Sequence, residues 1–508
     1  MKLLEMQDPF LLEVFRFALR TRCLTLLLQA LFNLLVPDHA ADAFRPPRLS
    51  ASKPGDQLLE LLLGGLARWD AEHFLFIAEH GYLYEHNLAF FPVYPLCVRV
   101  AADLVLWPLQ GLLCLRSCLM FSAVLLNAAF STLAAAALYH LGCVVLQCRR
   151  TAFIASLLYC LTPANVFMAA GYSESLFAFF AFSGLWQLEK RWHVTSYCLL
   201  SLATGVRANG LINIGFLLHS QCRRLLCGLQ SYLTSSARLP QLVGLFISST
   251  ASVILGTLAL SLPFALFQYY AYLTFCGADT SLKRDIPAPF LDLALDKGYR
   301  VAGGELPSWC SQKYPIAYTY VQDVYWNVGF LRYFSLLQIP NFLLALPVVT
   351  LISWATWTYV AADPWFCLKL GLQRQKLFDK TSVKTVTGFH NARVFVYVIH
   401  ASALLAFGLL CMHVQVLTRF LGSSSPVLYW FSAHLLQDSE PALWSRKAVA
   451  SFGTCQPAQF GKRNSVNPLP NLLLRWRTCT PVTKCILGYF LSYWLLGLIL
   501  HCNFLPWT

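Results

Sequence analysis

Residues 242–275 read LVGLFISSTASVILGTLALSLPFALFQYYAYLTF, an apolar stretch of 34 residues with no charged side chain. An α-helix needs about 20 mainly apolar residues to cross the hydrocarbon core of a bilayer. This stretch exceeds that length. We therefore interpret it as a membrane-spanning helix.

The composition extends this interpretation to the whole chain. Hydrophobic residues make up 57% of the sequence and charged residues only 12%, whereas soluble proteins carry about 25% charged residues. The apolar residues also form long blocks. These features exclude a water-soluble fold and predict an all-α polytopic membrane protein, with one membrane-embedded domain over residues 1–508.

About ten crossings are expected from the apolar blocks. The first block, 11–36, has no cleavage site after it and is interpreted as an uncleaved signal anchor. The ten predicted spans cover residues 11–36, 117–147, 151–170, 175–189, 193–206, 208–220, 242–275, 340–362, 394–418 and 484–503.

The net charge of +14 comes from short Lys and Arg clusters between these blocks. Such clusters are typical of cytosolic loops, so nucleic acid is not an expected partner. The clusters that fall on the cytosolic side of the ten-span topology are Arg16 with Arg20 and Arg22, Arg149–Arg150, Lys190–Arg191, Arg223–Arg224 with Arg238, and Lys369 through Arg393. One loop disagrees with this rule, because 419–482 is expected on the far side yet carries Arg446, Lys447, Lys462, Arg463, Arg475 and Arg477.

The polar segments expected on the far side of the membrane are a large first loop (37–88), a long loop (276–339) and the loop 419–482. The first loop is expected to carry a short interfacial helix at 71–80. The segment 89–111 is interrupted by prolines and charges, which favours an interfacial or re-entrant helix over a span. Cys276 and Cys310 flank the long loop, and their pairing is left open.

Asp70 is the first candidate for chemistry, in the string WDAEHF of the first loop. Transfer of a sugar from a lipid phosphate to a hydroxyl needs a carboxylate to accept the hydroxyl proton and cations or donors to hold the phosphate. An Asp before a short helix is, about equally often, only a helix cap. Glu72 and His73 are the alternatives or helpers.

Two further candidates lie in short polar turns between apolar blocks. Glu174 follows the turn AGYS, and an ionisable residue at membrane depth is a functional candidate by default; the alternative is a helix cap. Arg207, in GVRANG, could hold a phosphate through two parallel hydrogen bonds, or could extend to a lipid headgroup.

The remaining candidates lie beside later spans. Asp323, Trp326 and Asn327 in QDVYWNVGF suit sugar recognition, and they equally suit an interfacial aromatic belt. His413 and Arg419 in HVQVLTRF could bind phosphate or sugar, or could simply end a span.

The sequence contains no metal-binding or nucleotide-binding motif such as DxD, HExxH or a Walker loop. We therefore expect neither a metal nor a cofactor. The residues alone fit a lipid-linked glycosyltransferase, and they also fit a multispan transporter in which Glu174 and Arg207 are substrate or coupling residues.

Several long strings resemble the PIG-V family of GPI mannosyltransferases (GPI mannosyltransferase II). They run from the first loop to the last residue: WDAEHFLFIAEHGYLYEHN (69–87), TPANVFMAAGYSE (162–174), ATGVRANGL (203–211), LPFALFQYYAY (262–272), QDVYWNVGF (322–330), CMHVQVLTRFLGSSSP (411–426) and CNFLPWT (502–508). The resemblance implies a GT-C-type glycosyltransferase in the endoplasmic reticulum membrane, with a lumenal active site and a catalytic acid in the first lumenal loop. It implies mannose transfer, with inversion, from dolichol-phosphate-mannose to the mannosyl-glucosaminyl-phosphatidylinositol precursor of the GPI anchor, forming an α-1,6 bond.

The resemblance also suggests roles for single residues. Asp70 is similar in place to a general base; Arg207, Arg419 and His413 are candidates for the donor phosphate. Glu174, Asp323, Trp326 and Asn327 are candidates for the acceptor side. Another lipid-linked sugar transferase and a non-enzymatic scaffold or transporter remain as alternatives, and an accessory subunit is left open.

Overall fold

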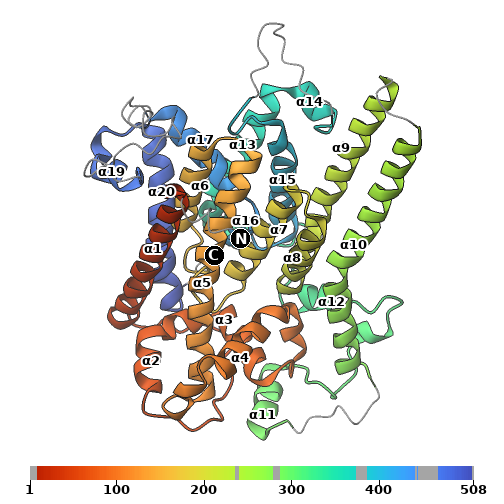
Figure 1. Ribbon diagram of the computed structural model, residues 1–508. Coiled ribbons are helices and arrows are strands. Elements are labelled where there is room, and N and C mark those ends of the chain that lie inside the picture. Colours follow the sequence, from red (N-terminus) through yellow and green to blue (C-terminus); the bar gives the residue numbers. More distant parts are fainter. Residues whose placement is uncertain are drawn as a thin grey trace.

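The computed structural model is a bundle of long helices with a layer of short helices at one end (Figure 1). It describes residues 8–234, 239–277, 286–372, 386–440, 443 and 467–505. Over these ranges the chain is helical and has no strand, and its only β-type pairing is an isolated bridge between Tyr84 and Val301. The all-α class expected from the apolar blocks is confirmed.

The long helices form the body of the bundle. They are α1 (Pro9–Leu35), α5 (Leu115–Val145), α6 (Arg149–Cys160), α7 (Glu174–Glu189), α8 (His193–Val206), α9 (Ile214–Leu233), α10 (Leu239–Phe275), α13 (Ile339–Ala362), α15 (Phe395–Cys411), α17 (Val427–Ser439) and α20 (Pro481–Cys502). Five described helical segments are long and apolar enough to cross a membrane: Leu115–Val145, Leu239–Phe275, Leu336–Ala362, Ala392–Cys411 and Pro481–Cys502. The count of ten crossings stays a prediction.

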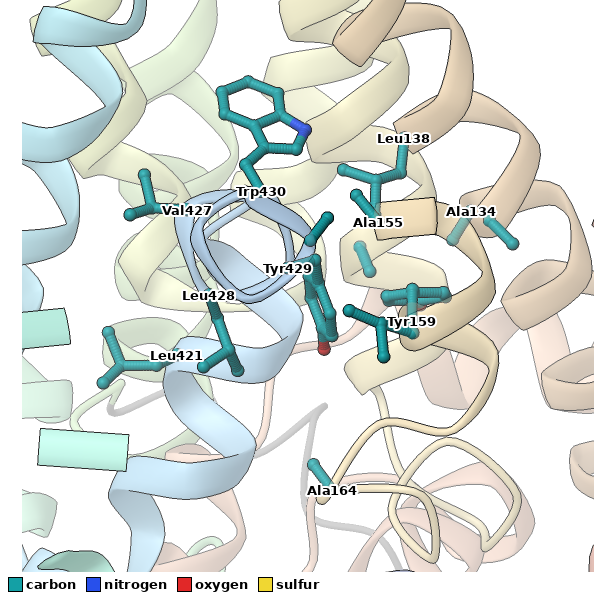
Figure 2. Packing of buried hydrophobic residues seen from close by; sticks show 14 of the residues in the cluster. Ala134, Leu138, Ala155, Tyr159, Ala164, Leu421, Val427, Leu428, Tyr429 and Trp430 are labelled. Atoms are coloured by element: carbon teal, nitrogen blue, oxygen red, sulfur yellow. The ribbon is translucent and has the colours of Figure 1, made fainter. Parts of the chain in front are cut away.

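Small residues allow the central helices to approach one another closely. A Cβ added at Gly142 of α5 would lie 2.9 Å from the Cβ of Ala152 on α6, so this crossing requires glycine. Figure 2 shows the side of the same core where Tyr429 and Trp430 of α17 lie beside small and aliphatic residues of α5 and α6. Close backbone approach through small residues is the usual basis of helix packing in membranes, where the hydrophobic effect does not drive helices together.

The segment 419–482 differs from the expected loop. Residues Leu417–Ser424 form α16 and continue, after Pro426, into α17, whose side chains from Val427 to Ala433 are buried. The chain therefore returns through the bundle, because this apolar run is covered on its sides by α6, α13 and α20.

The return through α17 reverses the expected direction of α20. At the far end of α17, Gln437 accepts a hydrogen bond from Thr151, near Arg149 and Arg150. Arg475 and Arg477 precede the start of α20, where the Thr480 backbone N–H donates to Glu440 at the far end of α17 at 3.4 Å. These two arginines thus lie at the bundle end that carries Arg149. They therefore no longer disagree with the rule that Lys and Arg clusters share the cytosolic side. Four other basic residues of this segment (Arg446, Lys447, Lys462 and Arg463), with Arg238, lie outside the described residues.

The layer of short helices at the other end, the lower end in Figure 1, comes mainly from the first loop. It contains α2 (Asp56–Leu63), η2 (Gly64–Ala67), α3 (Asp70–His80), η3 (Glu85–Ala89), α4 (Val93–Leu104) and η4 (Trp107–Gly111). The segment 89–111 is therefore no span, since the 12 residues of α4 rise only about 18 Å at 1.5 Å per residue. We call this end of the bundle the loop end.

The long loop 276–339 packs onto the first loop and completes this layer. It carries α11 (Ala288–Lys297), η7 (Ser308–Ser311), α12 (Ala317–Val324) and η8 (Leu336–Gln338). The structure contains the Cys276–Cys310 disulfide that the sequence left open. Glu85 of the first loop is fully buried and accepts hydrogen bonds from Trp309 Nε1 at 2.8 Å and Tyr325 Oη at 2.7 Å. The two loops are thus fixed to each other by specific polar contacts.

Candidate active site

Asp70 is the first residue of α3, and its carboxylate does not cap that helix. The N-cap position belongs to Trp69, which makes no side-chain capping bond and has a left-handed φ of 57°. Such backbone strain in a non-glycine residue is often found at functional sites. The Asp70 carboxylate lies 2.8 Å from Nη1 of Arg419 on α16. Within the described chain, the helix-cap interpretation of Asp70 is therefore replaced by an ion pair between residues 349 positions apart.

The pKa of Asp70 reflects two opposing effects. Burial acts to raise the pKa of this carboxyl, and the charge and hydrogen bond of Arg419 act to lower it, with smaller help from His73 and Arg207. The lowering effects prevail, so the pKa lies below its ordinary value. Asp70 is consequently ionised at neutral pH and able to accept a proton.

Glu174 links the two arginines that the sequence analysis singled out. Its carboxylate is completely buried at the first turn of α7 and lies 2.5 Å from Arg207 Nη1 and 3.8 Å from Arg419 Nη1. The N-terminus of a helix favours negative charge, but the contacts of Glu174 show more than a cap. Two carboxylates and two guanidiniums form one connected ionic cluster (Asp70, Arg419, Glu174 and Arg207).

Aromatic rings fix the position of Arg419. The centre of its guanidinium lies 5.1 Å from the ring centre of Phe167 and 5.3 Å from that of Tyr172. The Tyr172 hydroxyl also accepts a hydrogen bond from the Asp70 backbone N–H at 3.2 Å. Tyr172 therefore positions both partners of the ion pair.

A cavity of about 450 Å³ opens beside this cluster. Asp70, Arg207 and Arg419 line it together with His413 and Trp326. Its other walls are mainly apolar and aromatic side chains, among them Phe90, Phe264, Tyr318, Phe407, Met412 and Phe420. A charged cluster beside an apolar wall suits a lipid whose headgroup carries a phosphate. We call this space the catalytic cavity.

Not every predicted site residue lines the catalytic cavity. Glu72 is an ion-pair partner of Arg116 on α5 and lies 3.8 Å from Arg48. Asp323 is half exposed and pairs with Arg332. Asn327, although adjacent to Trp326, adopts a left-handed turn with φ of 50° and is not among the lining residues.

His73 lies between aromatic rings behind Asp70. Its ring stacks on Phe44 at 4.4 Å and on Phe90 at 4.7 Å, and its Nδ1 lies 3.2 Å from the Asn87 side-chain oxygen. Burial lowers the pKa of His73, against the opposing charge of Asp70. The imidazole is therefore neutral at pH 7 and serves as a wall of the site.

The sequence analysis missed residues that complete the cluster. Ser173 Oγ lies 3.4 Å from Arg207, and Asn209 donates to Ser424 Oγ at 2.8 Å. Tyr172 and Glu85 also went unnoticed, although both stand inside strings rich in aromatic and polar residues. No group of three or more His, Cys, Asp or Glu side chains gathers as a metal site in the described part of the chain.

Comparison with known proteins connects this geometry to a family. The family described as Mannosyltransferase (PIG-V) matches residues 11–508. Human GPI alpha-1,6-mannosyltransferase 2 is 59% identical over 502 residues, covering 99% of both chains, and the rat protein of the same name is 60% identical over 504 residues, again covering 99% of each. GPI mannosyltransferase 2 of Drosophila melanogaster is 33% identical over 87% of this chain and 95% of its own.

Two solved structures are more distantly similar. An oligosaccharyltransferase of Archaeoglobus fulgidus aligns with a TM-score of 0.42 at 13% identity, over 93% of this chain but only 56% of its own length. ArnT from Cupriavidus metallidurans, solved with undecaprenyl phosphate, aligns with a TM-score of 0.40 at 12% identity, over 95% of this chain and 76% of its own. Similarity at this level carries no argument about the site.

Proposed function

Since the chain belongs to the PIG-V mannosyltransferase family, we propose that it transfers mannose from dolichol-phosphate-mannose to the mannosyl-glucosaminyl-phosphatidylinositol precursor, forming an α-1,6 bond. The protein is a membrane-embedded glycosyltransferase of GPI-anchor synthesis. The donor, the exact acceptor, the lumenal face of the endoplasmic reticulum and the residue roles are parts of the proposal. The observation that carries it is the Asp70–Arg419–Glu174–Arg207 cluster at the mouth of a cavity with apolar walls.

The chemistry follows from the charges of this cluster. The 6-hydroxyl of the acceptor mannose attacks C1 of the donor mannose while the bond from C1 to the phosphate oxygen breaks. The hydroxyl proton passes to the Asp70 carboxylate, and the phosphate leaves with the bonding electron pair as dolichyl phosphate. One displacement inverts the β-linked donor to an α product, so one base is sufficient.

In this proposal Arg419 interacts both with the base, Asp70, and with the leaving phosphate. Without donor it neutralises Asp70, which lowers the basicity of the carboxylate. A bound phosphate competes for the same guanidinium, and each shift of Arg419 toward the phosphate makes Asp70 a stronger base. Arg207 and His413, which line the same cavity, supply further donors to the leaving group, and the developing phosphate charge is thereby stabilised.

The experiment that tests the proposal is Asp70→Asn in cells lacking the native enzyme, with Asp103→Asn as the matched control. Asp103 is a partly exposed acid of α4 that pairs with Arg99 outside the catalytic cavity. Loss of a general base should slow transfer by about 100-fold to 10,000-fold. Radiolabelled mannose should then accumulate in the one-mannose intermediate, while the control restores surface GPI proteins at equal protein level.

Full recovery of surface GPI proteins by Asp70→Asn would remove the base role and return Glu72 or Glu174 as candidates. If purified wild-type enzyme transfers no mannose from dolichol-phosphate-mannose, then this lipid is not the donor.

A further inference from the structure

A second cavity of about 420 Å³ lies at the loop end, on the opposite side of the first turn of α3. Its lining includes Arg45, Arg48, Arg68, Trp69, Glu72 and Phe504. None of these residues lines the catalytic cavity.

The first turn of α3 forms the partition between the two cavities. Trp69 and Glu72 line the second cavity, whereas Asp70 lines the catalytic cavity. The ring of His73 fills the wall between them, stacked between Phe44 of the second cavity and Phe90 of the catalytic cavity. The partition is one helix thick, about 10–12 Å across with its side chains. A ligand seated in the second cavity is therefore separated from the Asp70 carboxylate by the width of this one helix.

Three arginines and three carboxylates (Asp38, Glu60 and Glu72) line the second cavity, and Arg45 is the arginine best placed to take an anion. The guanidiniums of Arg45 and Arg68 lie over the ring of Phe504 at 4.6 Å and 4.5 Å. Arg68 pairs with Asp38 at 2.9 Å and Arg48 faces Glu72 at 3.8 Å. Arg45 has no carboxylate within 4.0 Å among the residues that the structure describes.

Two buried donors in this cavity also lack an acceptor in the described chain. They are Nε of Arg68 and Nε1 of Trp69. A buried donor without a partner is destabilising, and a bound ligand with phosphate or hydroxyl oxygens removes that cost. Together with the rings of Trp69 and Phe504, 5.8 Å apart, these donors form a surface suited to a sugar phosphate.

The end of the chain closes the second cavity. The backbone N–H of His39 donates to the Asn503 carbonyl at 2.9 Å, and Phe504 follows in a left-handed conformation with φ of 56°. This contact gives a structural role to Cys502–Leu505, the described part of the CNFLPWT string. The last three residues lie outside the described residues.

We propose that the second cavity binds the headgroup of the acceptor glycolipid, with its inositol phosphate against Arg45 and Arg68 and its sugars against Trp69 and Phe504. This inference rests on the proposed function and assigns its acceptor subsite. The acceptor is zwitterionic, because glucosamine carries an ammonium group, and Glu60 offers that group a carboxylate in the same cavity. The acceptor sugars then extend from the second cavity around the first turn of α3 toward Asp70, while the donor occupies the catalytic cavity.

The test measures binding to the purified full-length enzyme in detergent, without donor. The probes are the mannosyl-glucosaminyl-phosphatidylinositol acceptor and an octyl glycoside of the same disaccharide, which lacks the inositol phosphate. Arg45→Gln should raise the Kd of the phosphate-bearing acceptor about tenfold, the effect of losing one charge-assisted contact, and leave the Kd of the octyl glycoside unchanged. Phe504→Ala should weaken both probes.

Arg99→Gln is the matched control, a partly exposed arginine of α4 in the same layer but outside both cavities, and should change neither Kd. An unchanged Kd for the phosphate-bearing acceptor in Arg45→Gln overturns the inference, as does an equal change for both probes. Phosphatidylinositol without sugars is the third probe. If it displaces the acceptor at a concentration near the acceptor's own Kd, the cavity takes ordinary phospholipid headgroups and the acceptor assignment is wrong. Mannose transfer by the wild type is scored separately, so a failure of the proposed function is distinguished from a failure of this inference.

Discussion

Neutralising Glu174 should tighten the binding of lipid phosphate, and this outcome can be worked out from the ionic cluster. Two carboxylates, Asp70 and Glu174, face two guanidiniums, Arg207 and Arg419, so the cluster is neutral before the donor binds. The phosphodiester of the donor brings one negative charge. The variant Glu174→Gln keeps the shape of the side chain and gives the empty cluster a charge of +1.

The distances give the size of the effect. Glu174 lies 2.5 Å and 3.8 Å from the two guanidinium nitrogens, and a phosphate held by the same groups lies within roughly 8 Å of its carboxylate, where repulsion at an effective dielectric constant of about 20 is about 2 kcal/mol. Water in the cavity screens part of this repulsion. Removing the Glu174 charge should therefore lower the KM for dolichol-phosphate-mannose by roughly 5-fold to 30-fold.

The product offers a sharper readout than the donor. Dolichyl phosphate is a phosphate monoester and carries a charge of about −1.5 to −2 near neutral pH. Loss of the Glu174 charge should therefore lower the inhibition constant of dolichyl phosphate by a larger factor than the donor KM. Slower release of this product should lower kcat at the same time.

The assay is mannose transfer by purified enzyme, with donor titration and with dolichyl phosphate as inhibitor. Glu189→Gln is the matched control, because Glu189 lies on α7 at the end away from the cluster and accepts from Tyr397 at 3.2 Å. Both constants should be unchanged in the control. A Glu174→Gln enzyme with wild-type thermal stability and unchanged donor KM and product inhibition would refute a phosphate site beside Glu174.

Two other variants test the pH dependence and the loop layer. Arg419→Gln removes the charge that holds the pKa of Asp70 down, so burial then raises that pKa. The acid limb of the pH profile of kcat/KM should therefore move to higher pH. An acid limb at the wild-type position would contradict the ion pair. In the wild type the pKa is lowered, so the ion-pair stability is present at neutral pH and lost only as pH falls through the lowered pKa. Trp309→Phe removes the buried donor to Glu85 and should lower the free energy of unfolding by about 1–3 kcal/mol, measured as a lower Tm. The control is Trp365→Phe, at a residue 74% exposed, which should leave Tm unchanged. Equal Tm values for the two variants would count against the contact.

The sequence predicts the fold class because membrane helices leave a composition signal that needs no tertiary information. The block 242–275 lies within one continuous helix, Leu239–Phe275. Boundaries were less accurate elsewhere, although Pro263 does not interrupt α10. The predicted span 151–170 ends as a helix at Cys160, because Pro163 disfavours the helical conformation of the residue before it.

The site was predictable as a set of candidates but not as a cluster. Asp70, Glu174, Arg207 and Arg419 each stood out locally, as a charged residue beside an apolar block. Their pairing joins residues up to 349 positions apart, and no local pattern encodes which arginine meets which carboxylate. From the sequence, a helix cap and a catalytic base were equally good interpretations of Asp70, and the position of Arg419 in the structure decides against the helix cap.

The failure at 419–482 has a specific physical cause. A lipid-exposed span must be about 20 residues long, and the 13 residues of α17 are too few to meet that criterion. Helix α17 is buried by protein on its sides, so α16 and α17 can pass through the bundle together with a break at Pro426. The basic residues of 419–482, Arg475 and Arg477 among them, were the evidence for this return, because they contradicted the loop topology while the clusters outside this segment agreed with it. Where one charge cluster contradicts an otherwise consistent topology, a short protein-covered helix is therefore the first alternative to consider.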